Sequence, residues 1–419
     1  MEFGLDDTQE ALRDLAAGLL AKEASLERLE AHERDGAPYD QRLWQALREA
    51  GLTAICAPEH AGGAGLGPVE MAVVLREAGQ RAVPCPLAAT LVSTLAASLY
   101  GAPEHQKRLT GAAVSTIAIR EPGKALADPP ATTAERTPDG WALTGRKSGV
   151  AYPEGDVLVT AAEGLFLVPA PAKQSPDHRE GDAGSTTTSE TADLGPAATK
   201  GSPDDRDGVV IGTGSVRTSE TAQSAKVSPG DSEEAAAGSG AGAGVAVGVA
   251  EFASTGEDVA TVTFEGAPAE RVAGPEAVAG VRQIYTAAVA AQASGVLAGA
   301  LRLTTEHVRN RKQFGRALAE FQAVTVQVAD VYIAARALDV AMWSGAWRLA
   351  AGLPAEEDLA LAAFHACEAA RALYTCQHLH GGLGLDVTYP LHRYFAHAKH
   401  LAHQLGGAEA QLDLIGALA

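Results

Sequence analysis

Apolar residues recur at helical spacing over the first part of the chain. One face is carried by the leucines Leu12, Leu15, Leu19 and Leu20, and the same pattern continues with Leu43, Leu47 and Leu52. A glycine-rich turn at 57–67 separates these positions from a further helix, expected from Val69 to Gly79. The pattern predicts an N-terminal α-helical domain over residues 1–112.

Short runs rich in β-branched residues replace this pattern after residue 113. They are GWALTGRKSG (140–149), DVLVTA (156–161), LFLV (165–168) and VATVTFEG (259–266). Together they predict a middle β-sheet domain built from residues 113–171 and 246–272. Residues 172–245 interrupt it with Ser, Thr, Gly, Ala and Asp and contain no aromatic residue. We expect a low-complexity, disordered insertion there, with at most one short strand at 208–212.

Residues 273–419 return to a helical pattern that is strongly apolar. Three long helices are expected within 285–308, 323–350 and 358–379, followed by two shorter ones. Their alanine-rich sequences are apolar around much of the helix circumference. This pattern indicates a four-helix-bundle-type domain whose outer faces are covered by partner subunits.

Composition narrows the classes of function. The formal net charge of −19 argues against nucleic-acid binding, which uses basic patches to neutralise phosphates. No basic segment followed by an apolar stretch opens the chain, and no apolar run approaches the roughly 20 residues that span a bilayer. The four cysteines form no C-x-x-C pair, which predicts reduced thiols in a cytoplasmic protein without membrane partners.

Two motifs are candidates for binding a phosphorylated ligand. EHVRNRKQFGR places His307, Arg309, Arg311, Lys312 and Arg316 at a break between two long helices. Arginines at such a junction can bind phosphate oxygens, although composition alone favours a solvated loop. HLHGGLG (378–384) allows close approach of a pyrophosphate, or simply ends a helix.

The histidines near the C-terminus suggest a metal site only weakly. His397, His400 and His403 are three residues apart on one expected helix, with His392 upstream. No acidic residue falls within this run, so we interpret them as surface or interface histidines and predict no metal site.

Taken together, these motifs resemble the acyl-CoA dehydrogenase superfamily over nearly the whole chain outside the insertion. The similarity rests on APEHAGGAGLG, GWALTGRKSG, RKQFGRALAEFQ (311–322) and HGGLGLDVTYPLHRY (380–394). It implies an acyl-CoA dehydrogenase-like fold and FAD as cofactor. It also implies that the RKQFG segment binds the FAD pyrophosphate of a neighbouring subunit. The residues so implicated are Arg311, Gln313, Phe314, Phe321, Gln322, His378, Gly381, Gly382 and Gly384; His378 stands where the family usually has glutamine.

The catalytic glutamate of the family is missing from both of its usual positions. One of them is Tyr285 on the helix before RKQFG, and the other is Leu405 or Gly406 near the C-terminus. Tyrosine, with an unperturbed pKa of about 10, is a poor base at neutral pH. Glu409 is the nearest carboxylate but is offset by a few residues from the expected position, so we assign no catalytic residue to this chain.

The segments that hold the flavin in the family are altered as well. IREPGKALAD (119–128) lacks the usual hydroxyl residue before Glu121 and the Gly-Ser-Asp, and SGVAYPEGD replaces a tryptophan-containing strand. This asymmetry is similar to the subunit without the catalytic glutamate in actinobacterial heterotetrameric (α2β2) steroid side-chain acyl-CoA dehydrogenases. The resemblance implies a second, glutamate-bearing subunit, an acyl-CoA substrate and an electron-transfer flavoprotein as partners. Two alternatives remain open: a self-sufficient homotetrameric enzyme using Glu409, and a flavin-free structural or regulatory protein.

Overall fold

The computed structural model describes residues 4–169, 244–248 and 251–418. The expected insertion, including the possible strand at 208–212, therefore lies outside the described residues apart from its last two positions. Those two, residues 244 and 245, belong to a strand.

The N-terminal part is helical, as the pattern of leucines predicts. Its elements are α1 (Asp7–Glu23), α2 (Leu26–Asp35), α3 (Gln41–Glu49), the 3₁₀ turn η1 (Glu59–Ala61), α4 (Pro68–Gly79), α5 (Leu87–Tyr100) and α6 (Pro103–Gly111). Asp6 begins α1 through a reciprocal capping box with Gln9. One detail of the prediction is wrong: Leu15 is exposed, because the buried stripe of α1 runs through Leu12, Ala16 and Leu20. A small alanine replaces the expected leucine at the point of packing.

The middle part is a single sheet in which the long strand β8 joins two groups of strands. The elements are β1 (Ser115–Ala118), β2 (Thr133–Thr137), β3 (Gly140–Ala151), β4 (Asp156–Ala161), β5 (Gly164–Val168), β6 (Gly244–Val247), β7 (Glu251–Phe252) and β8 (Asp258–Ala273). Their order is β1-β4-β5-β8-β3-β2, with β6 and β7 also paired to β8. β1 and β4 are parallel, and the other pairs are antiparallel. β5 is buried at every position, which explains its uninterrupted apolar sequence.

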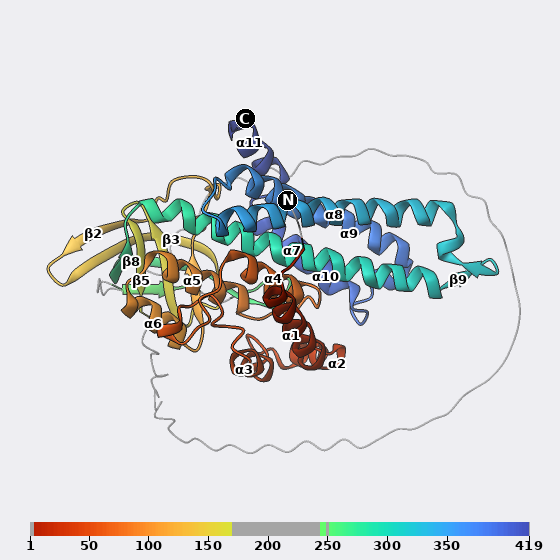
Figure 1. The fold of residues 1–419 in the computed structure, drawn as a ribbon, viewed down its shortest axis with the longest axis horizontal. Helices are drawn as coiled ribbons and strands as arrows, with labels where there is room; N and C mark the ends of the chain where they lie inside the picture. Colours follow the sequence, from red (N-terminus) through yellow and green to blue (C-terminus); the bar gives the residue numbers. More distant parts are fainter. Residues whose placement is uncertain (1–3, 170–243, 249–250, 419) are drawn as a thin grey trace, which may run out of the picture. The chain divides into compact units, whose positions relative to one another are not determined.

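The C-terminal part is a bundle of long helices (Figure 1). Its elements are α7 (Glu276–Asn310), β9 (Lys312–Gln313), β10 (Arg316–Ala317), η2 (Leu318–Glu320), α8 (Gln322–Ala350), α9 (Glu356–His380), η3 (Gly381–Leu385), α10 (Leu391–Gln404) and α11 (Ala408–Leu418). α7, α8 and α9 contact one another, and α10 packs on α7 and α9. The β9–β10 hairpin lies at the end of α7 farthest from the sheet.

Helix α7 is more apolar than the sequence reading allowed. By length and composition it could cross a membrane, which corrects the expectation that no apolar run reaches that length. However, 72% of its apolar window is buried inside the protein. The helix is therefore apolar because it forms the centre of the bundle.

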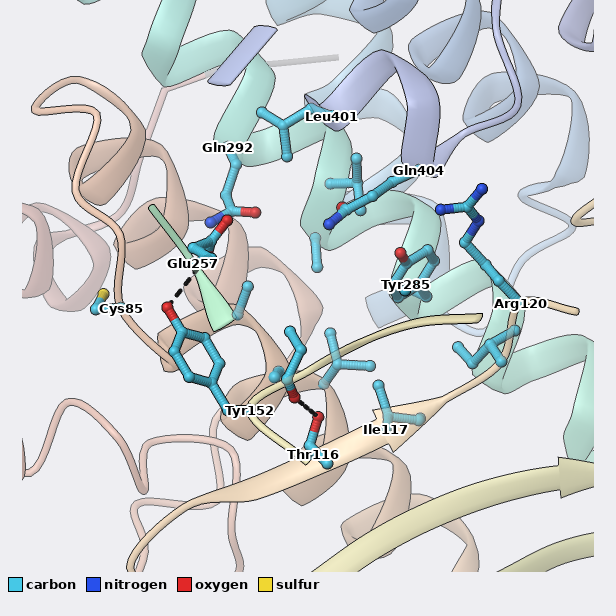
Figure 2. Close-up of a pocket in the computed structure, with 18 of the residues that line it drawn as sticks. Cys85, Thr116, Ile117, Arg120, Tyr152, Glu257, Tyr285, Gln292, Leu401 and Gln404 are labelled. Carbon is cyan, nitrogen blue, oxygen red and sulfur yellow. Dashed lines mark hydrogen bonds between the residues drawn. The ribbon is translucent and has the colours of Figure 1, made fainter. Parts of the chain in front are cut away.

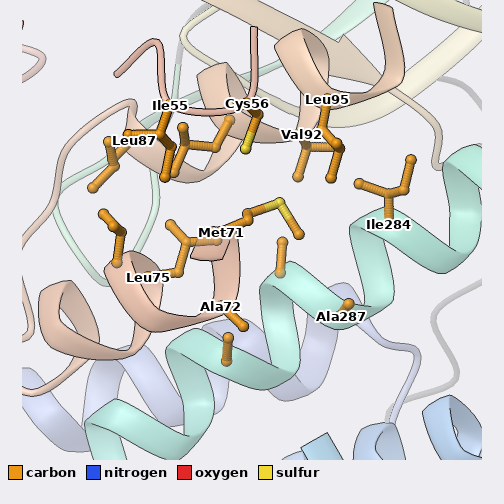
Figure 3. Close-up of a cluster of buried hydrophobic side chains, with 14 of the residues drawn as sticks. Ile55, Cys56, Met71, Ala72, Leu75, Leu87, Val92, Leu95, Ile284 and Ala287 are labelled. Atoms are coloured by element: carbon orange, nitrogen blue, oxygen red, sulfur yellow. The ribbon is translucent and has the colours of Figure 1, made fainter. Parts of the chain in front are cut away.

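The N-terminal helices pack directly on α7. Figure 3 shows Met71 of α4 and Leu95 of α5 in one buried cluster with Ile284 and Ala287 of α7, and Leu75 of α4 on the side of Leu87. The backbones of α4 and α7 cross at glycines. A Cβ atom on Gly79 would lie 2.3 Å from the carbonyl oxygen of Gln292, and one on Gly295 would lie 2.0 Å from that of Arg76. Larger residues there would push α4 away from the bundle.

Candidate functional site

The RKQFG segment forms a tight two-residue hairpin between α7 and α8. Gln313 pairs with Arg316, and Phe314 and Gly315 make the turn with φ values of +52° and +80°. Two successive positive φ values are typical of the turn that suits a hairpin's twist. The exact string therefore folds as a protruding arm, and Gly315 supplies the predicted turn.

Phe314 at the tip of this arm is unusual in two ways. A bulky residue with positive φ is strained, and its side chain is 90% exposed. Its ring meets Phe321 edge to face at 6.4 Å between centroids, and the Arg316 guanidinium lies 4.1 Å above Phe321. The arm thus offers an aromatic surface and positive charge at a position where nothing in the described chain covers it.

A cavity of about 580 Å³ lies between the base of the arm and the glycine segment after α9. Arg311, Gln313 and Gln327 line it from one side, and His378 through Leu383 line it from the other. Gly381 has a φ of +60°, a conformation that L side chains rarely adopt. A Cβ on Gly384 would lie 2.6 Å from the carbonyl oxygen of Gln377. Both glycines are needed to fold the segment back toward the arm.

The structure brings together most of the residues that the resemblance implicated. Arg311, Gln313, His378, Gly381 and Gly382 line the cavity. Phe314, Phe321 and Gln322 lie on the arm and at the start of α8, and Gly384 supports the glycine segment from behind. Sequence reasoning missed two further residues that line the cavity: Gln327, which lies outside both motifs, and His380, which opens the HGGLG string but was not singled out as a contact.

The positions expected for a catalytic base are far from this arm. Tyr285 is on α7, where burial raises its pKa to about 12. Leu405 is buried at the end of α10, and Gly406 follows with a φ of +86°. Glu409 is exposed in the first turn of α11. The raised pKa keeps the Tyr285 hydroxyl protonated at neutral pH, and Glu409 is the one carboxylate among these positions.

A cavity of only about 50 Å³ lies beside Tyr285, between the sheet and the helices (Figure 2). Arg120, Tyr152 and Tyr285 project into this region together with Gln404. Pockets for cofactors and drug-sized ligands usually enclose roughly 300–1,000 Å³. The space open beside Tyr285 is smaller than such pockets, because the side chains that line it occupy the region.

This filled site contains a carboxyl group that the sequence did not mark. Glu257 precedes β8 and accepts hydrogen bonds from Thr255 at 2.9 Å and from Tyr152 at 3.5 Å. Its Oε2 lies 3.7 Å from Nε2 of His400. Burial raises the pKa of Glu257 to about 7, and burial lowers the pKa of His400 to about 4. No motif or spacing distinguishes Glu257 from the other acidic residues of the chain.

Replacing Glu257 by glutamine should stabilise the protein, and the gain in free energy of unfolding over the parent should depend on pH. A carboxyl whose folded-state pKa is raised destabilises the fold as the pH rises from its unfolded value of 4.5 to about 7. Glutamine removes this loss, so the difference in free energy of unfolding between variant and parent should widen over that range by about 1.4 kcal/mol per pH unit, and the difference in Tm should widen with it. Thermal unfolding of both proteins between pH 5 and 8 measures it. A difference in Tm that stays constant between pH 5 and 8 would show that the pKa of Glu257 is not raised in the folded protein.

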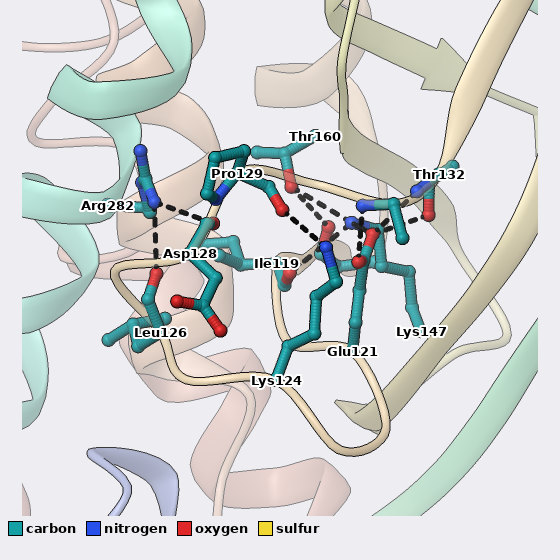
Figure 4. A network of polar contacts seen from close by, with 12 residues as sticks. Ile119, Glu121, Lys124, Leu126, Asp128, Pro129, Thr132, Lys147, Thr160 and Arg282 are labelled. Carbon is teal, nitrogen blue, oxygen red and sulfur yellow. Dashed lines mark hydrogen bonds and ion pairs between the residues drawn. The ribbon is translucent and has the colours of Figure 1, made fainter. Parts of the chain in front are cut away.

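The loop that replaces the flavin-facing segment is held by a buried ion pair (Figure 4). Nζ of Lys147 lies 2.7 Å from Oε1 of Glu121 and donates to the hydroxyl of Thr160 at 3.1 Å. Glu121 also accepts from the backbone and hydroxyl of Thr132. Although burial alone raises the pKa of Glu121, these donors lower it to about 2.

Arg282 of α7 fixes the far side of the same loop. Its guanidinium donates to the carbonyl oxygens of Leu126 at 3.2 Å and Asp128 at 2.9 Å, and also to that of Ala127 (Figure 4). The loop at 121–131 is thus closed at its two ends through Glu121 and held at its middle by Arg282.

The three-part fold, with its helical bundle and arm, is that of a class of flavin-dependent dehydrogenases. Residues 6–116 match the family "Acyl-CoA dehydrogenase, N-terminal domain", and residues 285–419 match "Acyl-CoA dehydrogenase, C-terminal domain". The chain belongs to the acyl-CoA dehydrogenase family, whose members normally bind FAD.

Relatives and solved structures give a finer comparison. The chain is 32% identical to acyl-CoA dehydrogenase FadE28 of Mycobacterium tuberculosis, covering 100% of this chain and 98% of that protein. It is 30% identical to FadE27 of the same organism, over 90% and 88%. Among solved structures it is similar to the Tcur3481-Tcur3483 steroid ACAD G363A variant, with a TM-score of 0.76, 30% identity and coverage of 98% and 97%. The ChsE4-ChsE5 complex from M. tuberculosis gives a TM-score of 0.76, 26% identity and coverage of 100% and 98%.

Proposed function

We propose that this chain is the non-catalytic subunit of a heterotetrameric (α2β2) FAD-dependent acyl-CoA dehydrogenase. A second subunit of the same family carries the catalytic glutamate, the flavin ring and the acyl-CoA. This chain supplies the arm and the glycine segment that bind the FAD pyrophosphate across the interface. Among similar structures, the named ChsE4-ChsE5 complex contains two different chains, which supports a heteromeric assembly.

The contrast between the two cavities carries this proposal. The cavity at the arm, about 580 Å³, has a size suited to part of a cofactor, and Arg311 and Gln313 provide donors for phosphate oxygens. The cavity at the usual active-site position, about 50 Å³, is filled by tyrosine and arginine side chains. A chain with a large cavity at the arm and a filled active-site position can contact a cofactor whose flavin ring is held by its partner.

When bound, FAD would supply the hydride acceptor for α,β-dehydrogenation of the acyl-CoA, with an electron-transfer flavoprotein as the electron acceptor. The residues of this chain act only in binding. The guanidinium of Arg311 offers a fixed fork of donors to the pyrophosphate. The hairpin keeps Arg311 and Gln313 on one rigid turn, and the glycines let the backbone approach the ligand closely. Phe314 packs beside the adenine.

A self-sufficient enzyme is the alternative that one observation favours, because Glu257 is a buried carboxyl with a pKa near neutrality. Its oxygens, however, are bonded to Thr255 and Tyr152 in a cavity too small for substrate. The exposed Glu409 offers no better base. We therefore expect the isolated chain to lack dehydrogenase activity.

The surface of α8 supports assembly with a partner. Four exposed apolar residues recur at intervals of seven, so they form one stripe along the helix: Val326, Ile333, Val340 and Trp347. Ile333 is 64% exposed. An apolar stripe of this length is typical of a helix that packs on another subunit, and we assign it to the glutamate-bearing partner.

Ile333→Asp is expected to prevent or strongly weaken this assembly, because it places a charge in the centre of an apolar interface. Native mass spectrometry of the co-expressed subunits measures the fraction in the tetramer. Leu15→Asp is the matched control, since Leu15 is an exposed leucine of α1 outside the stripe. If both variants assemble to the same extent, α8 is not part of the interface.

The remaining parts of the proposal concern substrate and compartment. The resemblance to steroid side-chain enzymes, together with the similar steroid ACAD structure, supports a steroid side-chain CoA thioester as substrate. The partner's pocket would select it. The four cysteines are free and buried, in keeping with a cytoplasmic site of action.

A further inference from the structure

Two histidines stack inside the cavity at the arm. The rings of His307 on α7 and His380 at the end of α9 lie 4.3 Å apart at an angle of 25°. On another side, the ring of Tyr389 lies 5.3 Å from that of His380. His380 is only 5% exposed, so its orientation is fixed by these neighbours. His380 opens the HGGLG string and His307 lies just before RKQFG, so the stack joins the two motifs.

The hydrogen bonds of His380 determine its tautomer. Its Nδ1 lies 2.8 Å from the carbonyl oxygen of Cys376, which can only accept, so Nδ1 carries the proton. Burial lowers the pKa of His380 and of His307, and the imidazole of His380 is therefore neutral at neutral pH. Its Nε2 is then an acceptor, and it is buried without a partner among the described residues. An unsatisfied buried acceptor of this kind is uncommon and calls for a donor.

The groups around the pair define what can supply that donor. His307 of α7 stacks on His380, and Tyr389 approaches from the segment before α10. Arg311, directly after α7, and His378, on the same helix as His380, line the same cavity. The pKa of Tyr389 is raised by burial and then by the charge of Glu306. The nitrogen donors of Arg311 and Gln313 suit phosphate oxygens, whereas Nε2 needs a hydroxyl or amino group.

We propose that His380, held between His307 and Tyr389, accepts a hydrogen bond from the adenosine half of the FAD that the partner subunit presents. This inference rests on the proposed function and adds a residue that discriminates between flavins. The adenosine ribose hydroxyls and the adenine amino group are the donors that FMN lacks. Coenzyme A also carries adenosine, so the ligand has to be identified by titration.

The test uses the co-expressed complex after removal of its flavin, titrated separately with FAD, FMN and coenzyme A. His380→Phe keeps a stacking ring and removes Nε2. It is expected to weaken FAD binding about tenfold, as for loss of one buried hydrogen bond, and to leave FMN binding unchanged. His380→Gln restores a polar group at similar reach and should recover most of the FAD affinity. His365→Phe is the matched control on the same helix, and it should behave as the parent complex.

Each other result overturns the inference in a recognisable way. Unchanged FAD affinity in His380→Phe would leave the proposed function intact and remove His380 from the site. Equal losses of affinity for FAD and FMN would show that His380 has a structural role. A loss of affinity confined to coenzyme A would show that His380 contacts coenzyme A and not FAD. A parent complex that binds no FAD would defeat the proposed function itself. If His380→Phe fails to assemble, His380→Leu removes Nε2 instead, and an FAD affinity equal to that of the parent complex there overturns the inference.

Discussion

Glu121→Ala is expected to lower the free energy of unfolding by about 3–5 kcal/mol, the largest stability effect we foresee. The substitution leaves the ammonium group of Lys147 without its carboxylate, and Lys147 is 0% exposed. Its remaining partners, the hydroxyl of Thr160 and the carbonyl oxygen of Ile119, carry no charge. Chemical denaturation of the purified chain measures the loss.

The double variant Glu121→Leu with Lys147→Met separates the ion pair from the packing. Replacing both charges by apolar groups of similar size removes the uncompensated ion, so the double variant should recover much of the loss seen in Glu121→Ala. A loss below about 1 kcal/mol for Glu121→Ala would mean that solvent screens the ion pair between Glu121 and Lys147. That result would contradict the buried network.

Arg311→Ala should weaken FAD binding by the assembled complex roughly 30-fold to 100-fold, and dehydrogenase activity at limiting FAD should fall with it. The reason is the loss of charge-assisted hydrogen bonds to the pyrophosphate, worth about 2–3 kcal/mol. Flavin fluorescence during FAD titration measures the change. The activity should return at saturating FAD, because Arg311 takes no part in proton or hydride transfer.

Arg309→Ala is the matched control for this experiment. Arg309 belongs to the same last turn of α7 and is exposed, but the cavity is lined by Arg311. Its removal changes the local charge equally and should leave FAD affinity close to that of the parent. Similar losses in the two variants would mean that general charge, rather than the position of Arg311, attracts the cofactor.

The sequence predicted those features that depend on local pattern. Short runs rich in β-branched residues located β3 and β8, and the strings RKQFG and HGGLG located both walls of the arm cavity. These motifs are readable because the turn and the close backbone approach require particular residues, above all Gly315 and Gly384. The acyl-CoA dehydrogenase fold followed from them and is confirmed by the family matches.

Features that depend on distant contacts could not be predicted in this way. Leu15 has the same pattern as its buried neighbours, yet tertiary packing leaves it in solvent. Glu257 is acidic in a turn, where exposure is the usual outcome, and only the packing of α10 against it produces a buried acid near His400. His380 became a candidate through the unpartnered Nε2 and the stack with His307, which are 73 positions apart in the sequence.

The most direct test of the heteromeric assignment is native mass and flavin content after co-expression with the acyl-CoA dehydrogenase encoded next to this chain's gene. We predict an α2β2 tetramer with one FAD per heterodimer, and a colourless or insoluble product from this chain alone. A yellow homotetramer with one FAD per chain would contradict the assignment and would direct the search for a base to Glu257 and Glu409.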